Sequence, residues 1–197
     1  MKRQKRATRG YGLLENFLAK KRADKADLLI PEDLRSGRIL DIGCGSYPYF
    51  LLNTKFKEKF GIDPSIHNLS VQNGVNLERA KAEKKLQFGN DFFDVVTMLA
   101  VFEHIDSKKI NYLLNEVKRV LKKDGLFIIT TPSPWADYLL HAMGKVGLIS
   151  SQEINEHKHN HKRKKIESMI EEAGFDRKKI KSGFFEFYAN MWFVVSK

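Results

Sequence analysis

Two glycines separated by a single residue follow the first apolar run of the chain, and this feature restricts the possible folds most. The run Arg38-Ile39-Leu40-Asp41-Ile42 leads directly into Gly43-Cys44-Gly45. Glycines at the carboxyl end of a strand let the backbone turn sharply and approach a ligand where side chains would obstruct it. With a helix expected over residues 49–56, the segment predicts a strand, a tight turn and a helix. We expect the backbone amides of this turn to face a polar ligand.

An acidic residue ends the next predicted strand. Lys59-Phe60-Gly61-Ile62-Asp63 repeats the pattern of a short apolar strand, and Pro64 suits the first turn of a following helix. At this distance from the glycine turn, a carboxylate can accept hydrogen bonds from the hydroxyls of a ribose. Taken singly, the glycines also fit a plain tight turn, and Asp63 also fits a helix N-cap. Together they predict an adenosine site.

The remaining pattern predicts alternating strands and helices. The expected elements are an amphipathic helix over residues 12–29, a strand near Val75, a central strand over 92–99, a helix over 107–121 with Ser107 as N-cap and Gly125 as its stop, a strand over 126–131, a helix over 162–173 ending at Gly174, and strands over 180–187 and 189–195. The last two strands are too close in sequence for a helix between them, so they should form an antiparallel hairpin. The expected fold is α/β: a Rossmann-like seven-stranded mixed sheet with helices on both faces and a C-terminal antiparallel hairpin.

One domain should account for nearly all of the 197 residues. We expect a basic N-terminal arm over residues 1–11 and a domain over 12–197 that carries a cap insertion at about 132–161. No apolar run approaches the roughly 20 residues that span a bilayer, and no apolar segment follows the basic start as in a secretory signal. A cytoplasmic location is therefore expected, and the single cysteine, Cys44, agrees with a reducing compartment.

The net charge of +11 is concentrated partly in the N-terminal arm, at Lys2, Arg3, Lys5, Arg6 and Arg9. Such an arm could attract phosphate-bearing partners, or it could be a solvated tail. No aromatic side chains are interleaved there for base stacking. A nucleic-acid partner stays open and is not favoured, and the oligomeric state cannot be read from the sequence.

Five segments together resemble the class I S-adenosylmethionine-dependent methyltransferases of the small-molecule, quinone-precursor and glycan-modifying type. They are Ile39–Gly45, Gly61–Asp63, Phe93–Val96, Phe102–Ile105 and Leu121–Leu126. The resemblance covers residues 38–131 closely and the remainder loosely. It implies an enzyme that uses S-adenosyl-L-methionine to methylate an O or N atom of a small molecule, glycan or lipid-linked precursor.

The resemblance also implies cofactor-binding roles for the first two strand ends. Gly43, Cys44 and Gly45 would line the methionine part of the donor. Asp41 would lie beneath the amino group of the donor, and Asp63 would bind its ribose.

Further donor contacts are implied on two other strands. Met98 and Leu99 would flank the methionine end of the donor. Asn76 is the nearest match to an acid that binds the adenine amino group in many family members, and an amide oxygen can accept the same hydrogen bond. Where the family often has a third glycine, this chain has Tyr47, followed by Pro48.

Glu103 and His104 follow the fourth predicted strand and are the candidate catalytic residues. His104 could remove a proton from a hydroxyl near neutral pH, or both residues could instead cap or brace the helix that starts at Ser107. Quinone-precursor O-methyltransferases, which this segment resembles, use such a pair with an earlier acid as magnesium ligands. Ala100 occupies the place of that acid, so no metal is expected.

A histidine-rich segment, Glu156–His161, could bind a metal because its imidazoles alternate, but Lys158, Lys162 and Arg163 would disfavour a cation. In polysaccharide- and lipid-modifying methyltransferases that this chain resembles, a similar segment borders the acceptor pocket. His157 and His159 are therefore candidates for that pocket. Trp135 and Tyr138 could line it or pack the cap on the sheet.

Several other activities fit less well. A dinucleotide-dependent dehydrogenase needs its third glycine where this chain has Pro48. Cytosine C5-methylation needs a cysteine nucleophile, and the only cysteine lies in the donor turn. Leu99-Ala100-Val101-Phe102 replaces the tetrapeptide typical of base-amine methylation. RNA methylation at another atom, suggested by the charge, and a non-catalytic donor-binding module, suggested by Tyr47, remain as alternatives.

Overall fold

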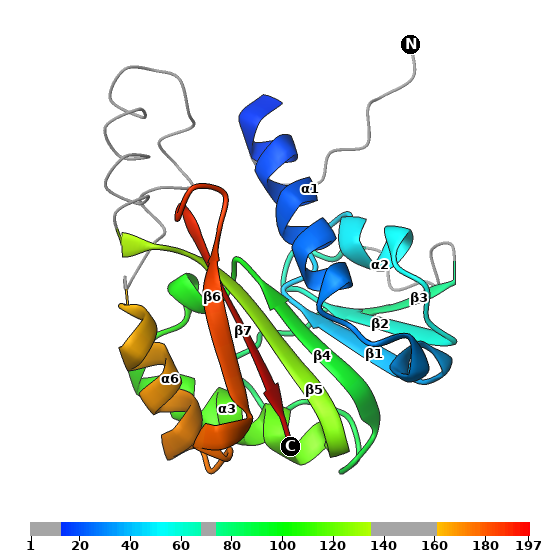
Figure 1. The fold of residues 1–197 in the computed structure, drawn as a ribbon. Coiled ribbons are helices and arrows are strands. Elements are labelled where there is room, and N and C mark those ends of the chain that lie inside the picture. Colours follow the sequence, from blue (N-terminus) through cyan, green and yellow to red (C-terminus); the bar gives the residue numbers. More distant parts are fainter. Residues whose placement is uncertain (1–12, 68–73, 135–160) are drawn as a thin grey trace.

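The computed structural model describes residues 13–67, 74–134 and 161–197, and within them seven strands form one mixed sheet (Figure 1). The strands are β1 Arg38–Ile42, β2 Glu58–Ile62, β3 Val75–Glu78, β4 Phe93–Leu99, β5 Leu121–Pro132, β6 Ile180–Phe185 and β7 Asn190–Ser196. Their spatial order is β3-β2-β1-β4-β5-β7-β6. The first five are parallel, whereas β7 is antiparallel to both β5 and β6. The predicted mixed sheet with its C-terminal hairpin is confirmed.

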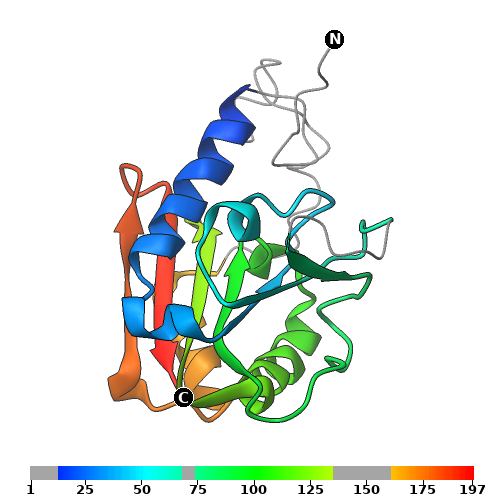
Figure 2. The same cartoon turned by 90° about the vertical axis from the view of Figure 1, so that its right-hand side faces the viewer.

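Helices cover both faces of this sheet, as predicted (Figure 2). The helices are α1 Leu13–Leu28 and α2 Tyr49–Asn53 on one face, and α3 Ser107–Val120 and α6 Arg163–Glu172 on the other. The helix predicted over 49–56 is shorter than expected, because the chain leaves it at Thr54, which has an extended backbone. Among the helices that the structure describes, none has both the length and the apolar character to cross a membrane.

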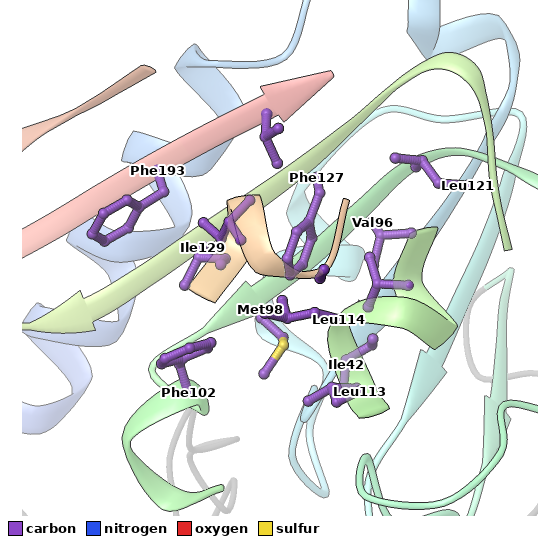
Figure 3. Close-up of a cluster of buried hydrophobic side chains, with 14 of the residues drawn as sticks. Ile42, Val96, Met98, Phe102, Leu113, Leu114, Leu121, Phe127, Ile129 and Phe193 are labelled. Carbon is purple, nitrogen blue, oxygen red and sulfur yellow. The ribbon is translucent and has the colours of Figure 1, made fainter. Parts of the chain in front are cut away.

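The two faces carry separate hydrophobic cores, because successive side chains of a strand point to opposite sides. Ile39 and Val95 belong to the core under α1 and α2, which also contains Ile128. Leu40 and Val96 belong to the core under α3 and α6. Figure 3 shows part of this second core, in which side chains of the sheet meet those of α3.

Helix α1 lies where it was predicted, but its larger apolar residues are not the ones that pack. Phe17 is 53% exposed and Leu28 is 83% exposed, whereas Ala23 and Ala26 are buried. Small side chains let a helix approach a sheet closely, so the contact face of α1 is the face that carries these alanines. The sequence predicted an amphipathic helix here, but Phe17 and Leu28 do not lie on its buried face.

The structure also differs from the sequence prediction at two helix starts. Asp106, not Ser107, caps α3, because its carboxylate accepts a hydrogen bond from the Lys108 amide at 3.0 Å and Ser107 is already inside the helix. Pro64 enters a turn, and no helix begins before the described segment ends at His67.

The end of α3 is sharper than expected. The helix stops at Val120, and the chain enters β5 directly, with a left-handed backbone (φ 61°) at Asp124. Gly125 does not take the left-handed conformation expected of a helix stop. A Cβ at Gly125 would lie 3.0 Å from the Asp94 carbonyl oxygen, so a glycine is required there by close packing.

The connection from β3 to β4 contains no helix and is held to α3 by Arg119. The guanidinium donates to the carbonyls of Leu86 (3.0 Å) and Phe88 (2.8 Å). It also forms two 2.8 Å bonds to the carboxylate of Glu116, which in turn accepts the Leu86 amide at 2.9 Å. The hydrogen bond from Arg119 is the main reason that the pKa of Glu116 is lowered.

Two predicted segments fall outside the described part of the chain. They are the basic arm over 1–11 and all of the cap over 132–161 except its two ends. The helix after the cap was expected to end at Gly174, and α6 does end there, with Gly174 at φ 85°.

Candidate functional site at the carboxyl edge of the sheet

The glycine turn lies at the end of β1, beside the end of β2. Gly43 (φ 78°) and Gly45 (φ 74°) both have left-handed backbones, which glycine adopts without strain. The amides of Gly43 and Cys44 donate to the Ile62 carbonyl at 2.8 and 3.2 Å, and the Gly45 amide donates to a carboxylate oxygen of Asp63 at 3.0 Å. The expectation that these amides face a ligand is therefore wrong. Because β1 and β2 are parallel and end at the same level, the Ile62 carbonyl and the Asp63 carboxylate at the end of β2 lie within reach of the turn.

The two glycines of the turn differ in what surrounds them. A Cβ at Gly43 would lie 2.3 Å from a methyl carbon of Val101, the second residue after β4, so packing within the protein requires this glycine. Among the residues that the structure describes, a Cβ at Gly45 would meet nothing nearer than the Tyr47 carbonyl oxygen, at 3.9 Å. The backbone at Gly45 is therefore the part of the turn that a ligand can approach.

A third glycine, Gly61 on β2, supports the turn, a role that the sequence did not indicate. A Cβ at Gly61 would lie 2.7 Å from the sulfur of Cys44. The Cys44 side chain is buried in the core under α1 and α2, and burial raises the pKa of its thiol. Cys44 thus belongs to the turn through its backbone, and its thiol is directed into the protein.

Asp41 is a buried carboxylate at the carboxyl end of β1, with 4% of its surface exposed. One oxygen accepts a hydrogen bond from the hydroxyl of Thr97 on β4 at 2.7 Å. Burial raises the pKa of Asp41 to about 7, the Thr97 bond opposes this, and the charge of Asp63 adds to it. A cation placed beside Asp41 would favour its charged form, so the position suits an ammonium group.

Asp63 is also buried, 5% exposed, at the end of β2. One carboxylate oxygen accepts the amide of Ser65 at 2.7 Å and also its hydroxyl, and the other accepts the Gly45 amide. The predicted N-cap role is thus replaced by an Asx turn through Pro64.

Successive residues at the end of β4 point to opposite faces of the sheet. Asp41 is paired with Thr97, so Leu99 shares the face of Asp41 and Met98 points to the other face. Leu99 is half-buried, whereas Met98 has no exposed surface and lies in the core beside α3 (Figure 3). The prediction that Met98 flanks the donor is therefore wrong. The same alternation could have been applied to the sequence, since adjacent strand residues rarely contact one ligand.

Ala100 ends β4 with a left-handed backbone (φ 54°), which is uncommon for a residue other than glycine. Its amide donates to the Thr130 carbonyl of β5 at 2.8 Å. Such backbone strain persists only where the surroundings hold it, and it is found mostly at functional sites. Nothing in the sequence indicated it.

The register contradicts the prediction that Asn76 stands at the ligand edge. Asn76 pairs with Phe60 in the middle of β2, is exposed, and donates from its amide to the Lys59 carbonyl at 3.4 Å. Glu78 is the residue that pairs with Ile62 at the carboxyl end. Which residue of β3 reaches the carboxyl edge depends on where the strand ends, and sequence patterns define strand ends poorly.

Glu103 and His104 follow β4 in a short 3-10 helix, Phe102–His104, and their environments differ. Glu103 is 2% exposed and accepts a hydrogen bond from the Thr131 hydroxyl of β5 at 3.0 Å, so it braces this segment against β5 rather than against α3. His104 is half-buried. The ring of Phe102 meets that of His161, the described residue at the end of the cap, edge to face at 6.3 Å. The catalytic roles of Glu103 and His104 stay predictions.

No cluster of three or more His, Cys, Asp or Glu side chains that could hold a metal ion occurs within residues 13–67, 74–134 and 161–197. The candidates His157 and His159, like Trp135 and Tyr138, lie outside the described residues.

A glycine turn after β1, with buried acids at the ends of β1 and β2, defines an α/β domain that holds a nucleoside-type ligand at the carboxyl edge of its sheet. The chain belongs to the methyltransferase domain family, whose model matches residues 14–178. The predicted class, S-adenosylmethionine-dependent methyltransferases of class I, is confirmed, and with it the cofactor of the family.

Known relatives agree with this assignment. The chain is 34% identical over 98 residues to the "Probable S-adenosylmethionine-dependent methyltransferase CRG1" of Saccharomyces cerevisiae, covering 45% of this chain and 33% of that protein. It is 33% identical over 116 residues to the "Ubiquinone biosynthesis O-methyltransferase" of Roseobacter denitrificans, covering 53% and 45%. The chain thus spans less than half the length of either relative. A SAM-dependent methyltransferase from Archaeoglobus fulgidus has the same fold, with a TM-score of 0.69 at 18% identity, over 90% of this chain and 94% of that one.

Proposed function

We propose that this chain transfers a methyl group from S-adenosylmethionine to an O or N atom of a small molecule, glycan or lipid-linked precursor. One observation carries the proposal. Two buried carboxylates, Asp41 and Asp63, stand at the ends of adjacent parallel strands, and one of them is hydrogen-bonded to the glycine turn between them.

The residues present fit this donor. Open space at Gly45 leaves room for a ligand against the backbone. Asp41 would hold the positively charged amino group, and Asp63 would accept hydrogen bonds from ribose hydroxyls. S-adenosylmethionine supplies an electrophilic methyl group attached to a positively charged sulfur. The protein's task is then to hold an acceptor in line and to exclude water.

A proton must leave a hydroxyl acceptor, and His104 is the residue we assign to remove it. An imidazole titrates close to neutral pH and reacts within hydrogen-bond distance of its target. Glu103 would be a positioning residue, because its hydrogen bond with Thr131 fixes the short helix that carries His104. An amine acceptor that is already neutral needs no such base.

The acceptor class is inferred from a relative and from the charge of the chain. The name of the Roseobacter relative describes an O-methyltransferase of ubiquinone biosynthesis, which agrees with an oxygen acceptor on a lipid-linked precursor. The net charge of +11 favours the alternative of an RNA acceptor, since cations attract the phosphate backbone.

The test is a two-stage measurement on the full chain. Calorimetry first measures the affinity for S-adenosylmethionine, and the formation of S-adenosylhomocysteine is then followed with separate small-molecule, glycan, lipid and RNA pools. We expect turnover with one of the first three. Turnover with RNA alone, together with salt-sensitive RNA binding, would select the RNA reading. Donor binding without turnover in any pool would make the chain a non-catalytic donor-binding module.

A further inference from the structure

Three aromatic side chains at the end of the β6–β7 hairpin, one on β6 and two in the turn, are exposed to solvent. Phe187 is 96% exposed, Tyr188 is 64% exposed and Phe184 is 38% exposed. The rings of Phe184 and Tyr188 lie against each other, with centroids 5.2 Å apart. Large apolar groups gathered on a surface usually mark a site of interaction.

The backbone of this turn is held in an unusual conformation. Glu186, Phe187 and Tyr188 have successive φ values of 52°, 52° and 66°. Left-handed backbone costs of order 1 kcal/mol or more for residues other than glycine and asparagine, and it persists where surrounding bonds enforce it. Glu186 accepts a hydrogen bond from the Asn190 side chain at 2.6 Å, and the Ala189 carbonyl accepts the Ser133 amide at 2.9 Å. The turn thus presents its aromatic side chains on a fixed support.

The turn lies at the same edge of the sheet as the glycine turn. Asn190, the first residue of β7, pairs with Pro132 at the carboxyl end of β5. Figures 1 and 2 both show the β6–β7 turn beside the middle of α1, at the end of the molecule toward which β5 runs.

Basic side chains lie over two of the aromatic rings in this region, and one of them, Arg163, also forms an ion pair with Glu167 at 3.8 Å. The Arg163 guanidinium lies over the Phe184 ring at 5.4 Å, and the Lys21 ammonium lies over the exposed Phe17 ring at 5.5 Å. Glu186 is the acid within the turn. Burial raises its pKa, and the charges of Arg22 and Lys21 on α1 partly offset this, which places these cations close to the turn. We name Phe17, Lys21, Arg163, Phe184, Phe187 and Tyr188 the tip surface.

We propose that the tip surface docks the enzyme on an anionic lipid bilayer, with the aromatic side chains in the interfacial layer and the cations at the headgroups. Aromatic rings favour this layer, and each nearby Lys or Arg adds attraction to anionic lipid. A nearly fully exposed side chain at the end of a hairpin can enter such a layer, whereas single-stranded nucleic acid is bound by aromatic faces along a charged groove. Docking here turns the donor edge of the sheet toward the lipid.

The proposal is tested with the full chain and no donor, so its outcome is independent of the proposed methyl transfer. Co-sedimentation compares vesicles of phosphatidylcholine alone with vesicles that also contain phosphatidylglycerol. We expect binding to the anionic vesicles that weakens as salt is raised. Equal binding to both vesicle types, or none, would overturn the proposal.

The aromatic part is tested with Phe187→Asn combined with Tyr188→Asn, because asparagine tolerates the left-handed backbone and the fold is kept. Binding should fall by about tenfold or more. Tyr112→Asn is the matched control, since Tyr112 on α3 is 46% exposed and does not belong to the tip surface. If both variants bind as the wild type does, the tip surface is not the docking site.

The charged part is tested with Lys21→Glu, for which Lys178→Glu at the opposite edge of the sheet is the control. Only the first change should weaken binding to anionic vesicles, by roughly tenfold for a reversal of one charge. A competition experiment with polyuridylic acid tests whether the tip surface binds RNA instead of lipid. If the tip variants lose RNA binding while vesicle binding is absent, the surface binds nucleic acid and the proposal fails.

Discussion

The carboxylate of Asp63 accepts a hydrogen bond from the backbone amide of Gly45 at 3.0 Å, and this bond ties an acidic side chain at the end of β2 to the glycine turn after β1. The residue expected to hold the ribose therefore also shapes the turn expected to hold the methionine part of the donor. Changes at Asp63 should act on both.

Replacing Asp63 by alanine should weaken donor binding by about 1 to 3 kcal/mol, because hydrogen bonds to a charged group are lost. Calorimetry with S-adenosylmethionine measures this as a fall in affinity of about 5- to 150-fold. Ser65→Ala is the control, since it keeps the carboxylate and removes only the hydroxyl that Asp63 accepts. An unchanged affinity of the Asp63→Ala variant would refute the ribose assignment.

The two glycines of the turn should respond differently to alanine. Gly43→Ala should destabilise the protein, because its Cβ would lie 2.3 Å from Val101. Gly45→Ala should unfold nearly as the wild type does in urea, apart from about 1 kcal/mol of left-handed backbone strain. It should nevertheless bind the donor more weakly, because its Cβ takes up the open space. Equal losses of stability in both variants would contradict the distinction.

The pKa of about 7 at Asp41 predicts that donor binding depends on pH. A bound ammonium group favours the ionised carboxylate, so binding should release a proton, and affinity should rise by roughly tenfold or more from pH 5 to pH 7. Calorimetry in buffers of different ionisation enthalpy detects the proton. Asp41→Asn should bind weakly and without this dependence. A pH-independent affinity in the wild type would place the amino group elsewhere.

The same group predicts how stability depends on pH. The pKa of Asp41 is raised above its ordinary value of 3.8, so the protonated carboxyl is favoured in the fold. Its stabilising contribution is complete below about pH 4 and is lost as the pH rises toward 7. Relative to Asp41→Asn, the wild type should therefore lose stability across this range. Urea unfolding of both proteins at several pH values measures the difference.

If His104 is the general base, His104→Gln should lower kcat by about 10²- to 10⁴-fold on a hydroxyl acceptor and leave donor affinity unchanged. Glu103→Gln should have a smaller effect, because the amide oxygen can still accept the Thr131 hydroxyl. A rate that survives in His104→Gln would assign His104 a structural role.

Arg119→Ala should destabilise the fold by about 2 to 4 kcal/mol, since it leaves the buried Glu116 carboxylate and two loop carbonyls without their donor. Lys109→Ala is the control. Its ion pair with Glu83 is more exposed, and such surface pairs contribute about 0 to 1 kcal/mol. Chemical denaturation compares the two. Similar losses would mean that the β3–β4 connection does not depend on Arg119.

Much of the fold could be predicted from local patterns. The alternation of apolar strands with helical stripes predicted the seven strands, and the short gap between the strands expected over 180–187 and 189–195 required a hairpin. Asp41, Gly43, Gly45 and Asp63 could be selected because each stands at the end of a strand, where the carboxyl edge of a parallel sheet gathers them. Met98 and Asn76 were misplaced because strand facing and strand register are set by neighbouring strands.

The sequence by itself determined the order of the elements and the chemical groups at the ends of β1 and β2. Only the tertiary structure decided that the amides of the turn bond to Ile62 and Asp63, that Glu103 is held by Thr131, and that the pKa of Asp41 is near 7. The physical reason is the distance along the chain over which each effect acts. Backbone periodicity acts over a few residues, whereas burial and hydrogen bonding join groups that only the folded sheet brings together.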